Sequence, residues 1–240
     1  MPDKKLEGWQ KILPNQDFNS NLYRGSEPFE KALYETILNV SGIKSPTEKF
    51  TIEQTDMFTI EEMASSPMVL GFLQWLIEIA GVRRILEIGT FVGVSSMYMA
   101  EALPDGGELV TIEKFDHFAD IARKNFTNNG FDGVISLING DAAEMIKNLD
   151  PVKPFDLVFI DGNKERYAKY FDDVAPLVRP GGIIVTDDAL FHGDALNASP
   201  ESDKGKGVKA FLSRAAASTD WRRSLIPISN GIVVMTKPVA

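Results

Sequence analysis

The sequence predicts an α/β fold built on a doubly wound, mostly parallel sheet of seven strands, with helices at its amino-terminal end. After Gly81, short runs rich in β-branched residues alternate with amphipathic stretches, which is typical of a parallel sheet covered by helices on both faces. The last two runs lie close together, so we expect a hairpin and one antiparallel strand at the end of the sheet. The predicted strands are 83–88, 108–113, 133–138, 155–160, 182–186, 222–228 and 231–236.

Helical periodicity marks the amino-terminal region and the segments between the strands. Ser66 and Pro67 predict the start of one helix, as cap and first helical residue, and Gly81 predicts its end. The preceding segment, 43–65, looks like a loop. The clearest helical stretches are 29–40 after a Ser26 cap, 66–80, 164–177 and 208–215.

Composition excludes several classes of protein. The chain has 240 residues with 25 Lys and Arg against 34 Asp and Glu, and its formal charge of −9 would repel a phosphate backbone. No apolar run reaches the ~18 residues of a membrane span, and the first residues lack the apolar stretch of a secretory signal. We therefore expect a cytoplasmic protein that binds neither nucleic acid nor membrane. Without cysteine, any metal or nucleophile must use oxygen or nitrogen.

A glycine-rich turn follows the first predicted strand. Gly89 and Gly93 allow a tight strand-to-helix connection that brings the backbone close to a ligand, although a purely structural turn explains them about as well. Glu87 lies inside the strand, where a carboxylate needs a cationic or donor-rich partner. The second strand ends in Glu113, at the position where such folds place an acceptor for ribose hydroxyls, and a solvated strand end is the alternative. Together these features indicate a nucleoside-like cofactor.

Acidic residues also follow the third, fourth and fifth predicted strands. Asp141 and Glu144 have the spacing of a capping box, and Asp141 could also reach the amine of an adenine. Asp161, Asp187 and Asp188 should meet at one edge of the sheet, where they would repel one another without a cation. Oxygen ligands favour Mg²⁺, with Mn²⁺ or Ca²⁺ as replacements, and serve zinc poorly. For either acidic pair alone, a helix cap is the simpler interpretation.

Taken as an ordered set, these motifs resemble the cation-dependent class I S-adenosylmethionine O-methyltransferases of the catechol and caffeoyl-coenzyme A type, which have a Rossmann-like fold. The resemblance covers residues 61 to about 236. No single motif is specific, but their order and spacing are. The motifs are Met63-Ala64-Ser65-Ser66, the turn from Glu87 to Ser95, Glu113, Gly140-Asp141-Ala142, Asp161-Gly162-Asn163-Lys164-Glu165-Arg166-Tyr167 and Asp187-Asp188-Ala189-Leu190-Phe191-His192-Gly193.

The resemblance implies roles for individual residues. Glu87 and Gly89 would lie beside the methionine moiety of the cofactor and Glu113 would hold its ribose. Lys164 would be the general base, acting together with Asp161. The full set implied for cofactor binding is Met63, Ser65, Glu87, Gly89, Gly93, Ser95, Glu113, Asp141, Ala142 and Asp161, and the set implied for the metal is Asp161, Asp187 and Asp188.

The reaction implied is an in-line displacement, in which a hydroxyl of a small aromatic substrate attacks the methyl group of S-adenosylmethionine. Vicinal hydroxyls would chelate the metal, which lowers the pKa of one of them and fixes its position. Residues 61–240 would form the methyltransferase domain, and the family is commonly homodimeric. The helical extension 1–60, which contains Phe18, Tyr23, Phe29 and Phe58, is expected to cover the active site or a subunit partner.

Two residues depart from the family pattern. Asp188 stands where asparagine is frequent, which adds negative charge to the metal site, and Asn163 stands where animal catechol enzymes place an aromatic gate. His192 follows the metal pair and could touch the substrate, although a single loop histidine is more often only solvated. We assign His117 to a helix surface.

Other functions fit parts of the same pattern. A metal-independent methyltransferase would share the glycine turn. A nicotinamide-dependent oxidoreductase would use a similar turn, but its motif usually needs a third glycine near Ser95. A non-catalytic cofactor-binding protein would keep the turn without needing the complete set of Asp161, Lys164, Asp187 and Asp188.

Overall fold

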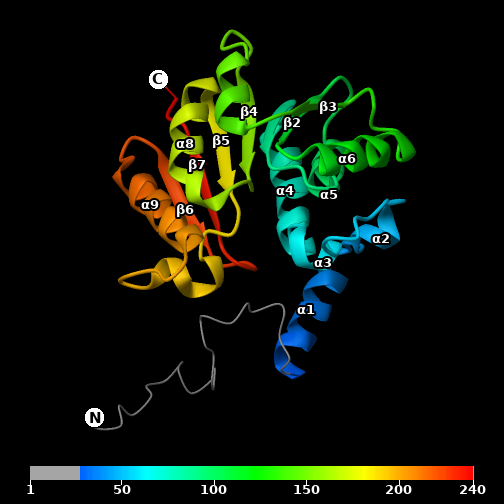
Figure 1. The fold of residues 1–240 in the computed structure, drawn as a ribbon, viewed down its shortest axis with the longest axis horizontal. Coiled ribbons are helices and arrows are strands. Elements are labelled where there is room, and N and C mark those ends of the chain that lie inside the picture. Colours follow the sequence, from blue (N-terminus) through cyan, green and yellow to red (C-terminus); the bar gives the residue numbers. More distant parts are fainter. Residues whose placement is uncertain (1–27, 240) are drawn as a thin grey trace.

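The structure is a computed structural model that describes residues 28–239 (Figure 1). It contains one seven-stranded sheet with the order β3-β2-β1-β4-β5-β7-β6, in which β1 to β5 run parallel and β7 pairs antiparallel with both β5 and β6. The predicted fold class is confirmed. The strands are β1 (Arg84–Ile88), β2 (Glu108–Glu113), β3 (Ile135–Asn139), β4 (Phe155–Ile160), β5 (Val178–Thr186), β6 (Arg222–Ile226) and β7 (Ile232–Thr236).

Strand β5 begins four residues before its predicted start at 182. The register between β4 and β5 shifts between Phe155 and Leu157, so that Phe155 pairs with Val178 and Leu157 pairs with Ile183. Gly181 lies inside this irregularity at φ +72, a conformation that glycine adopts without strain. Gly181 therefore marks a bulge within the strand.

Among residues 28–239, some of the observed helices agree with the helical stretches predicted from the sequence and others differ. Ser66 caps α4 by accepting from the Val69 amide at 3.4 Å, and Gly81 ends the helix in the left-handed region. The helix expected at 164–177 is instead a short α-helix between two 3₁₀ turns. The helical elements are α1 (Pro28–Ser41), α2 (Pro46–Lys49), α3 (Ile60–Met63), α4 (Pro67–Ala80), α5 (Val94–Glu101), α6 (Asp116–Asn128), α7 (Ala142–Met145), η2 (Ile146–Asn148), η3 (Lys164–Arg166), α8 (Tyr167–Val174), η4 (Ala175–Leu177), η5 (Phe191–Leu196) and α9 (Asp203–Ala217).

The segment 43–65 is not all loop, because it contains the single-turn helices α2 and α3. Each begins with a hydroxyl residue followed three positions later by glutamate: Glu48 accepts from the Ser45 amide at 3.1 Å, and Glu62 accepts from the Thr59 amide at 2.9 Å. These capping pairs are visible in the sequence and could have predicted both turns. The proposed helix cap Ser26 and the aromatic residues Phe18 and Tyr23 lie outside the described residues.

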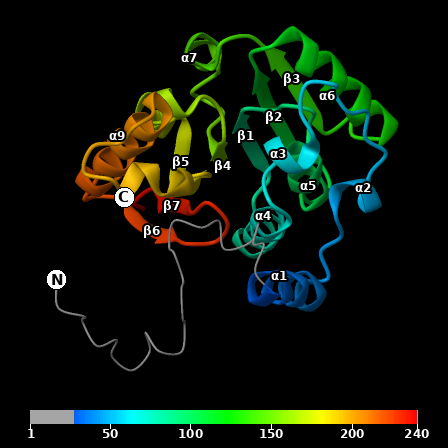
Figure 2. The ribbon, with the colours of Figure 1, turned by 60° about the horizontal axis from the view of Figure 1, so that its bottom comes forward.

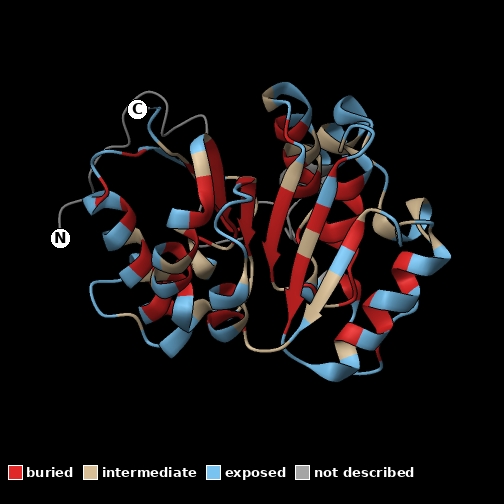
Figure 3. Ribbon diagram, turned by 90° about the horizontal axis from the view of Figure 1, so that it is seen from above, coloured by how far each residue is buried: buried red, intermediate tan, exposed pale blue. Residues whose placement is uncertain are grey.

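Two layers of helices enclose the sheet (Figures 1 and 2). On one face α4, α5 and α6 bury Leu73, Met97 and Phe126 against the strands. On the other face α8 and α9 pack Phe171 and Phe211 against the strands, with ring centroids 6.3 Å apart. Colouring by burial shows the central strands almost wholly buried and the outer faces of the helices exposed (Figure 3). No helix within residues 28–239 is long and apolar enough to span a membrane.

Residues 50–65, which we call the strap, run along α6 towards the carboxyl edge of the sheet. Two asparagines hold the strap through hydrogen bonds to its backbone. Asn125 lies in α6, and Asn129 is the carboxyl-terminal cap of that helix. Asn129 accepts from the Thr51 amide at 3.0 Å and donates to the Thr51 carbonyl at 2.8 Å. Asn125 makes the same pair of bonds with Glu53, at 2.7 and 3.0 Å. The strap is therefore fixed in place by side-chain amides rather than by a further strand.

Asn125 should contribute more to the stability of the fold than Asn129. Its side chain is fully buried and also donates to the Val92 carbonyl at 2.9 Å, so Asn125→Ala leaves buried backbone groups without partners. We expect the free energy of unfolding to fall by about 2–4 kcal/mol, as measured by chemical denaturation. Asn129→Ala is the matched control, because the Asn129 side chain is half-buried and water can take the place of its hydrogen bonds. Equal losses in the two variants would contradict this assignment.

Candidate active site

The carboxyl ends of β1, β2, β4 and β5 meet at one edge of the sheet. The parallel hydrogen bonding continues one residue past the strands: the Gly89 amide donates to the Ile112 carbonyl at 3.0 Å, and the Asp161 amide donates to the Ile88 carbonyl at 2.9 Å. The Asp187 amide continues the same pattern on the next strand. The residues that follow each strand are therefore held side by side by the sheet itself.

The glycine turn after β1 packs tightly against its surroundings. Gly89 has φ +97, and a Cβ there would collide with the Asp161 carbonyl oxygen. Gly93 has φ +89, and a Cβ there would collide with the Phe126 ring of α6. Both positions therefore require glycine for space as well as for backbone conformation. The tight strand-to-helix turn predicted from the sequence is present, and it touches the end of β4 directly.

Glu87 is fully buried and surrounded by hydroxyl groups. Its carboxylate accepts from Ser95 Oγ at 2.5 Å and from Thr111 Oγ1 at 2.6 Å, and it also accepts from Ser96 Oγ. The donor-rich surroundings expected for a carboxylate inside a strand are therefore present. Burial nevertheless raises the pKa of Glu87 to about 7, because the hydroxyls only partly replace water. Ser96 and Thr111 were not singled out from the sequence.

Glu113 closes the glycine turn from the end of β2. One of its oxygens accepts from the Phe91 amide at 2.8 Å and from the Thr90 amide at 3.2 Å, and the other accepts from the Phe115 amide at 2.9 Å. Only 5% of the residue is exposed. Glu113 thus fixes the conformation of the turn, and its contact with a ribose stays a prediction.

Asp141 is the N-cap of α7, as expected, and accepts from the Ala143 amide at 3.0 Å. Glu144 bonds to Lys147 instead of completing a capping box, so that part of the prediction is wrong. Partial burial opposes the charge of Asp141, but its bonds to Lys114, to the Ala143 amide and to Arg166 hold its pKa below the usual value. The two cations lie 3.1 and 3.0 Å from the carboxylate and were missed in the sequence.

Asp161, Asp187 and Asp188, which we call the carboxylate cluster, follow neighbouring strands at the same edge of the sheet, and Lys164 bridges Asp161 and Asp188. The Lys164 ammonium lies 2.7 Å from Asp188 Oδ2 and 3.2 Å from Asp161 Oδ1. On the far side, Ser65 Oγ donates to Asp161 Oδ2 at 3.3 Å. The buried Tyr167 hydroxyl donates to Asp161 Oδ1 at 3.4 Å, a contact that the apolar stripe of its helix gave no reason to expect.

The cluster carries more negative charge than Lys164 neutralises. Burial, followed by repulsion from its neighbours, raises the pKa of Asp187 well above its usual value, and burial likewise raises the pKa of Asp161. Burial also opposes the charge of Asp188, but Lys164 holds its pKa low. In turn, although burial opposes the ammonium, the surrounding acidic groups raise the pKa of Lys164 well above its usual value.

No set of three or more acidic or histidine side chains within residues 28–239 is arranged as a ready metal site. The Lys164 ammonium instead bridges two of the three carboxylates. The chemistry of the donors nevertheless fits a hard divalent cation, because all three are carboxylate oxygens and one ammonium leaves two formal negative charges. The residues predicted for the metal thus suit it chemically, and the metal itself stays a prediction.

The remaining predicted residues lie at the border of this region. Met63 ends α3 with 45% of its surface exposed. Asn163 caps η3 by accepting from the Glu165 amide at 3.2 Å. His192 is exposed on its outer side, and its ring lies against Asn230. His117 lies on the surface of α6, as predicted.

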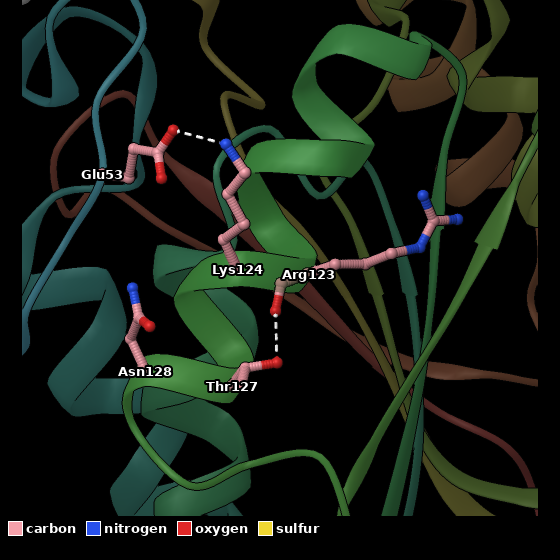
Figure 4. Close-up of a pocket in the computed structure, with 5 residues that line it drawn as sticks. All are labelled: Glu53, Arg123, Lys124, Thr127 and Asn128. Atoms are coloured by element: carbon pink, nitrogen blue, oxygen red, sulfur yellow. Dashed lines mark hydrogen bonds and ion pairs between the residues drawn. The ribbon is translucent and has the colours of Figure 1, made fainter.

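A separate hollow lies along the carboxyl-terminal half of α6 (Figure 4). Because α6 follows β2 and returns across the sheet, this half lies away from the carboxyl ends of the strands. The cations at the hollow already have partners: Lys124 lies 2.8 Å from Glu53, and Arg123 lies 3.0 Å from Asp120. The hollow therefore adds nothing to the chemistry of the carboxylate cluster.

A glycine turn after β1, carboxylates at the ends of β2, β4 and β5, and an antiparallel last strand together define a Rossmann-like methyltransferase. A family model described as O-methyltransferase matches residues 41–238. The chain belongs to this O-methyltransferase family and is an enzyme of that class. The oxidoreductase and non-catalytic alternatives are thereby set aside.

Individual relatives support the same assignment. The chain is 34% identical over 156 residues to a catechol O-methyltransferase of Niastella koreensis, covering 64% of this chain and 71% of the relative. It is 30% identical to probable caffeoyl-CoA O-methyltransferase 2 of Dictyostelium discoideum, covering 79% and 81%. Among solved structures, O-methyltransferase TomG of Streptomyces achromogenes, in complex with SAM, has a TM-score of 0.74 at 28% identity and covers 85% and 96%. An O-methyltransferase of Bacillus cereus in complex with SAH has a TM-score of 0.69 at 26% identity, covering 95% and 94%.

The raised pKa of Glu87 should appear in the pH dependence of stability. Between pH 4.5 and about 7 the folded chain keeps a proton on Glu87 that the unfolded chain releases, so this residue makes stability fall as the pH rises through that window. Glu87→Gln removes this contribution. Relative to the wild type, the variant should gain on the order of 3 kcal/mol between pH 4.5 and 7.5, as measured by denaturant unfolding. A pH-independent difference would show that Glu87 titrates normally.

Proposed function

We propose that this O-methyltransferase transfers a methyl group from S-adenosylmethionine to one hydroxyl of a small vicinal dihydroxy aromatic molecule, with a divalent metal, first of all Mg²⁺, at the carboxylate cluster. One observation carries the proposal: Gly89 of the turn packs directly on the Asp161 backbone, and the Asp161 side chain belongs to the cluster. A donor held at the turn and an acceptor held at the cluster would therefore be neighbours.

The turn and its supports suit an adenosyl cofactor. The relatives from Streptomyces achromogenes and Bacillus cereus were solved with SAM and SAH. In this chain Glu113 holds the turn through the backbone amides of Thr90 and Phe91, and Asp141 stands ion-paired at the end of the next strand. We assign the ribose to Glu113 and the adenine to Asp141 and Ala142.

A cation at Asp161, Asp187 and Asp188 would relieve their mutual repulsion and would lower the pKa of a bound hydroxyl. The chain's own residues supply orientation. Ser65 and Tyr167 donate to opposite oxygens of Asp161 and limit its rotation. Aligning the two reactants can contribute roughly 7–11 kcal/mol of the barrier reduction, which suits a displacement that needs little covalent assistance.

Lys164 is our candidate for accepting the hydroxyl proton, because a cation bound at Asp161 and Asp188 would replace its ammonium as their partner and would favour the neutral amine. Its ammonium is tied to Asp161 and Asp188, so it stands at the cluster rather than in solvent, with 15% of its side chain exposed. A homodimer, and an amino-terminal region up to residue 60 of which part covers the active site or a subunit partner, are further proposals that accompany this assignment.

The decisive experiment is a panel of vicinal dihydroxy aromatics with S-adenosylmethionine and Mg²⁺, repeated after thorough EDTA treatment and with Asp161→Ala. We expect EDTA and the substitution each to lower turnover at least about 100-fold, because both remove the group that positions and activates the hydroxyl. Asp156→Ala is the matched control, since Asp156 lies at the opposite end of the same strand and bonds Arg179. That variant should lose stability and stay sensitive to EDTA.

Turnover that survives EDTA would instead favour the metal-independent methyltransferase. Binding of S-adenosylmethionine without turnover of any vicinal diol, while a monohydroxy compound is methylated, would refute the acceptor class. Turnover that is unchanged in Asp161→Ala would refute the metal assignment.

Lys164→Met tests the proton acceptor. We expect kcat to fall by roughly 10²–10⁴, the range for losing a general base, with binding of S-adenosylhomocysteine unchanged in calorimetry. Lys169→Met is a suitable control, because Lys169 pairs with Asp173 on the helix surface. A loss of S-adenosylhomocysteine binding in Lys164→Met that accounts for the whole loss of activity would remove Lys164 from the chemistry.

A further inference from the structure

Asn230 lies in the turn between β6 and β7, and only 7% of it is exposed. The sequence gives this residue no role beyond separating two strands. In the structure the turn reaches the loop 188–193 that follows β5. The Leu190 amide donates to the Asn230 carbonyl at 2.7 Å, and the Ala189 amide donates to the Gly231 carbonyl at 2.8 Å.

The Asn230 side chain is directed at the two ends of this loop. Its Oδ1 accepts from the His192 amide at 3.0 Å, and its Nδ2 lies 3.2 Å from the His192 ring nitrogen Nε2. The same side chain lies close to the Asp188 carboxylate and, together with Lys164, helps to hold the pKa of that group low. One buried amide thus contacts a member of the carboxylate cluster and the histidine that follows it.

The loop needs such an anchor because its backbone is strained. Asp188, Phe191 and His192 have φ values of +53, +44 and +52. This is the left-handed region of backbone conformation, which residues other than glycine rarely adopt. Such conformations persist only where the surroundings determine them. The Asn230 contacts lie at the first and last of these three positions.

We propose that Asn230 is a positioning residue of the active site, which orients the Asp188 carboxylate and the His192 ring at the border of the carboxylate cluster. Lys164 approaches Asp188 at Oδ2, and Asn230 supplies a second donor. With both donors in place, the carboxylate is held in one orientation. This inference rests on the proposed function, because it assigns Asp188 to the metal.

The test uses the full chain and two probes bound separately, Mn²⁺ alone and S-adenosylhomocysteine alone, both measured by titration calorimetry. Asn230→Ala should weaken Mn²⁺ binding by roughly 10–100-fold, the range for removing a group that orients a metal ligand, and should leave S-adenosylhomocysteine binding unchanged. Asn129→Ala removes a similar set of amide bonds far from the cluster and should change neither. Normal Mn²⁺ binding in Asn230→Ala would overturn the proposal.

A double-mutant cycle separates positioning from simple support of the loop. If Asn230 acts through Asp188, then Asn230→Ala should weaken Mn²⁺ binding much less in an Asp188→Asn background than in the wild type. Additive losses would show that Asn230 only stabilises the loop, and they would also overturn the proposal.

A wild type that binds no Mn²⁺ would refute the metal assignment and not the role of Asn230. The same cycle is then measured on the hydrogen-exchange rates of the Leu190 and His192 amides. Non-additive changes there would support coupling between Asn230 and Asp188, and additive changes would refute it.

Discussion

Burial of acidic side chains at the carboxyl edge of the sheet is the constraint that shapes the whole site. Parallel strands end together, so residues that follow neighbouring strands cannot move apart. Asp161, Asp187 and Asp188 therefore share a region with little water and one ammonium, that of Lys164. Removing a carboxylate from water is unfavourable unless charge or hydrogen bonds replace the water. The raised pKa values of Asp161 and Asp187 show that the replacement is incomplete.

The other acidic residues nearby are stabilised in different ways. Glu87 has hydroxyl donors, which are neutral and leave its pKa raised to about 7. Glu113 has three backbone amides, two of which belong to the glycine turn and fix its conformation. Asp141 has two cations, and its pKa is lowered. The carboxylate cluster alone combines close carboxylates with too few donors. Glu87, Glu113 and Asp141 therefore have their partners within the fold, whereas the charges of the carboxylate cluster are only partly compensated.

The sequence predicted the features that depend on local pattern. Strand ends, the glycine turn and the meeting of Asp161 with Asp187 follow from alternation and from parallel topology, so they could be anticipated. Contacts that depend on the exact path of the chain could not. Asn125 reaches the strap across 72 residues, and Asn230 reaches His192 across 38. An asparagine in a helix or a turn has an ordinary local explanation, and only the packed structure shows its distant partner. The bulge of β5 was missed because Gly181 signals a strand end and an irregular strand equally well.

The antiparallel last strand has a specific consequence for the site. Because β7 runs opposite to β5, with Thr186 paired to Val233, β7 begins at the edge where β5 ends. The turn that precedes β7 therefore lies beside the loop that carries Asp188. A parallel strand in that position would begin at the opposite edge, and its preceding connection would lie there too. The hairpin of β6 and β7 thus completes the sheet and also delivers a turn to the reacting edge. Variation of this turn can change the border of the site without altering the strands that hold the carboxylates.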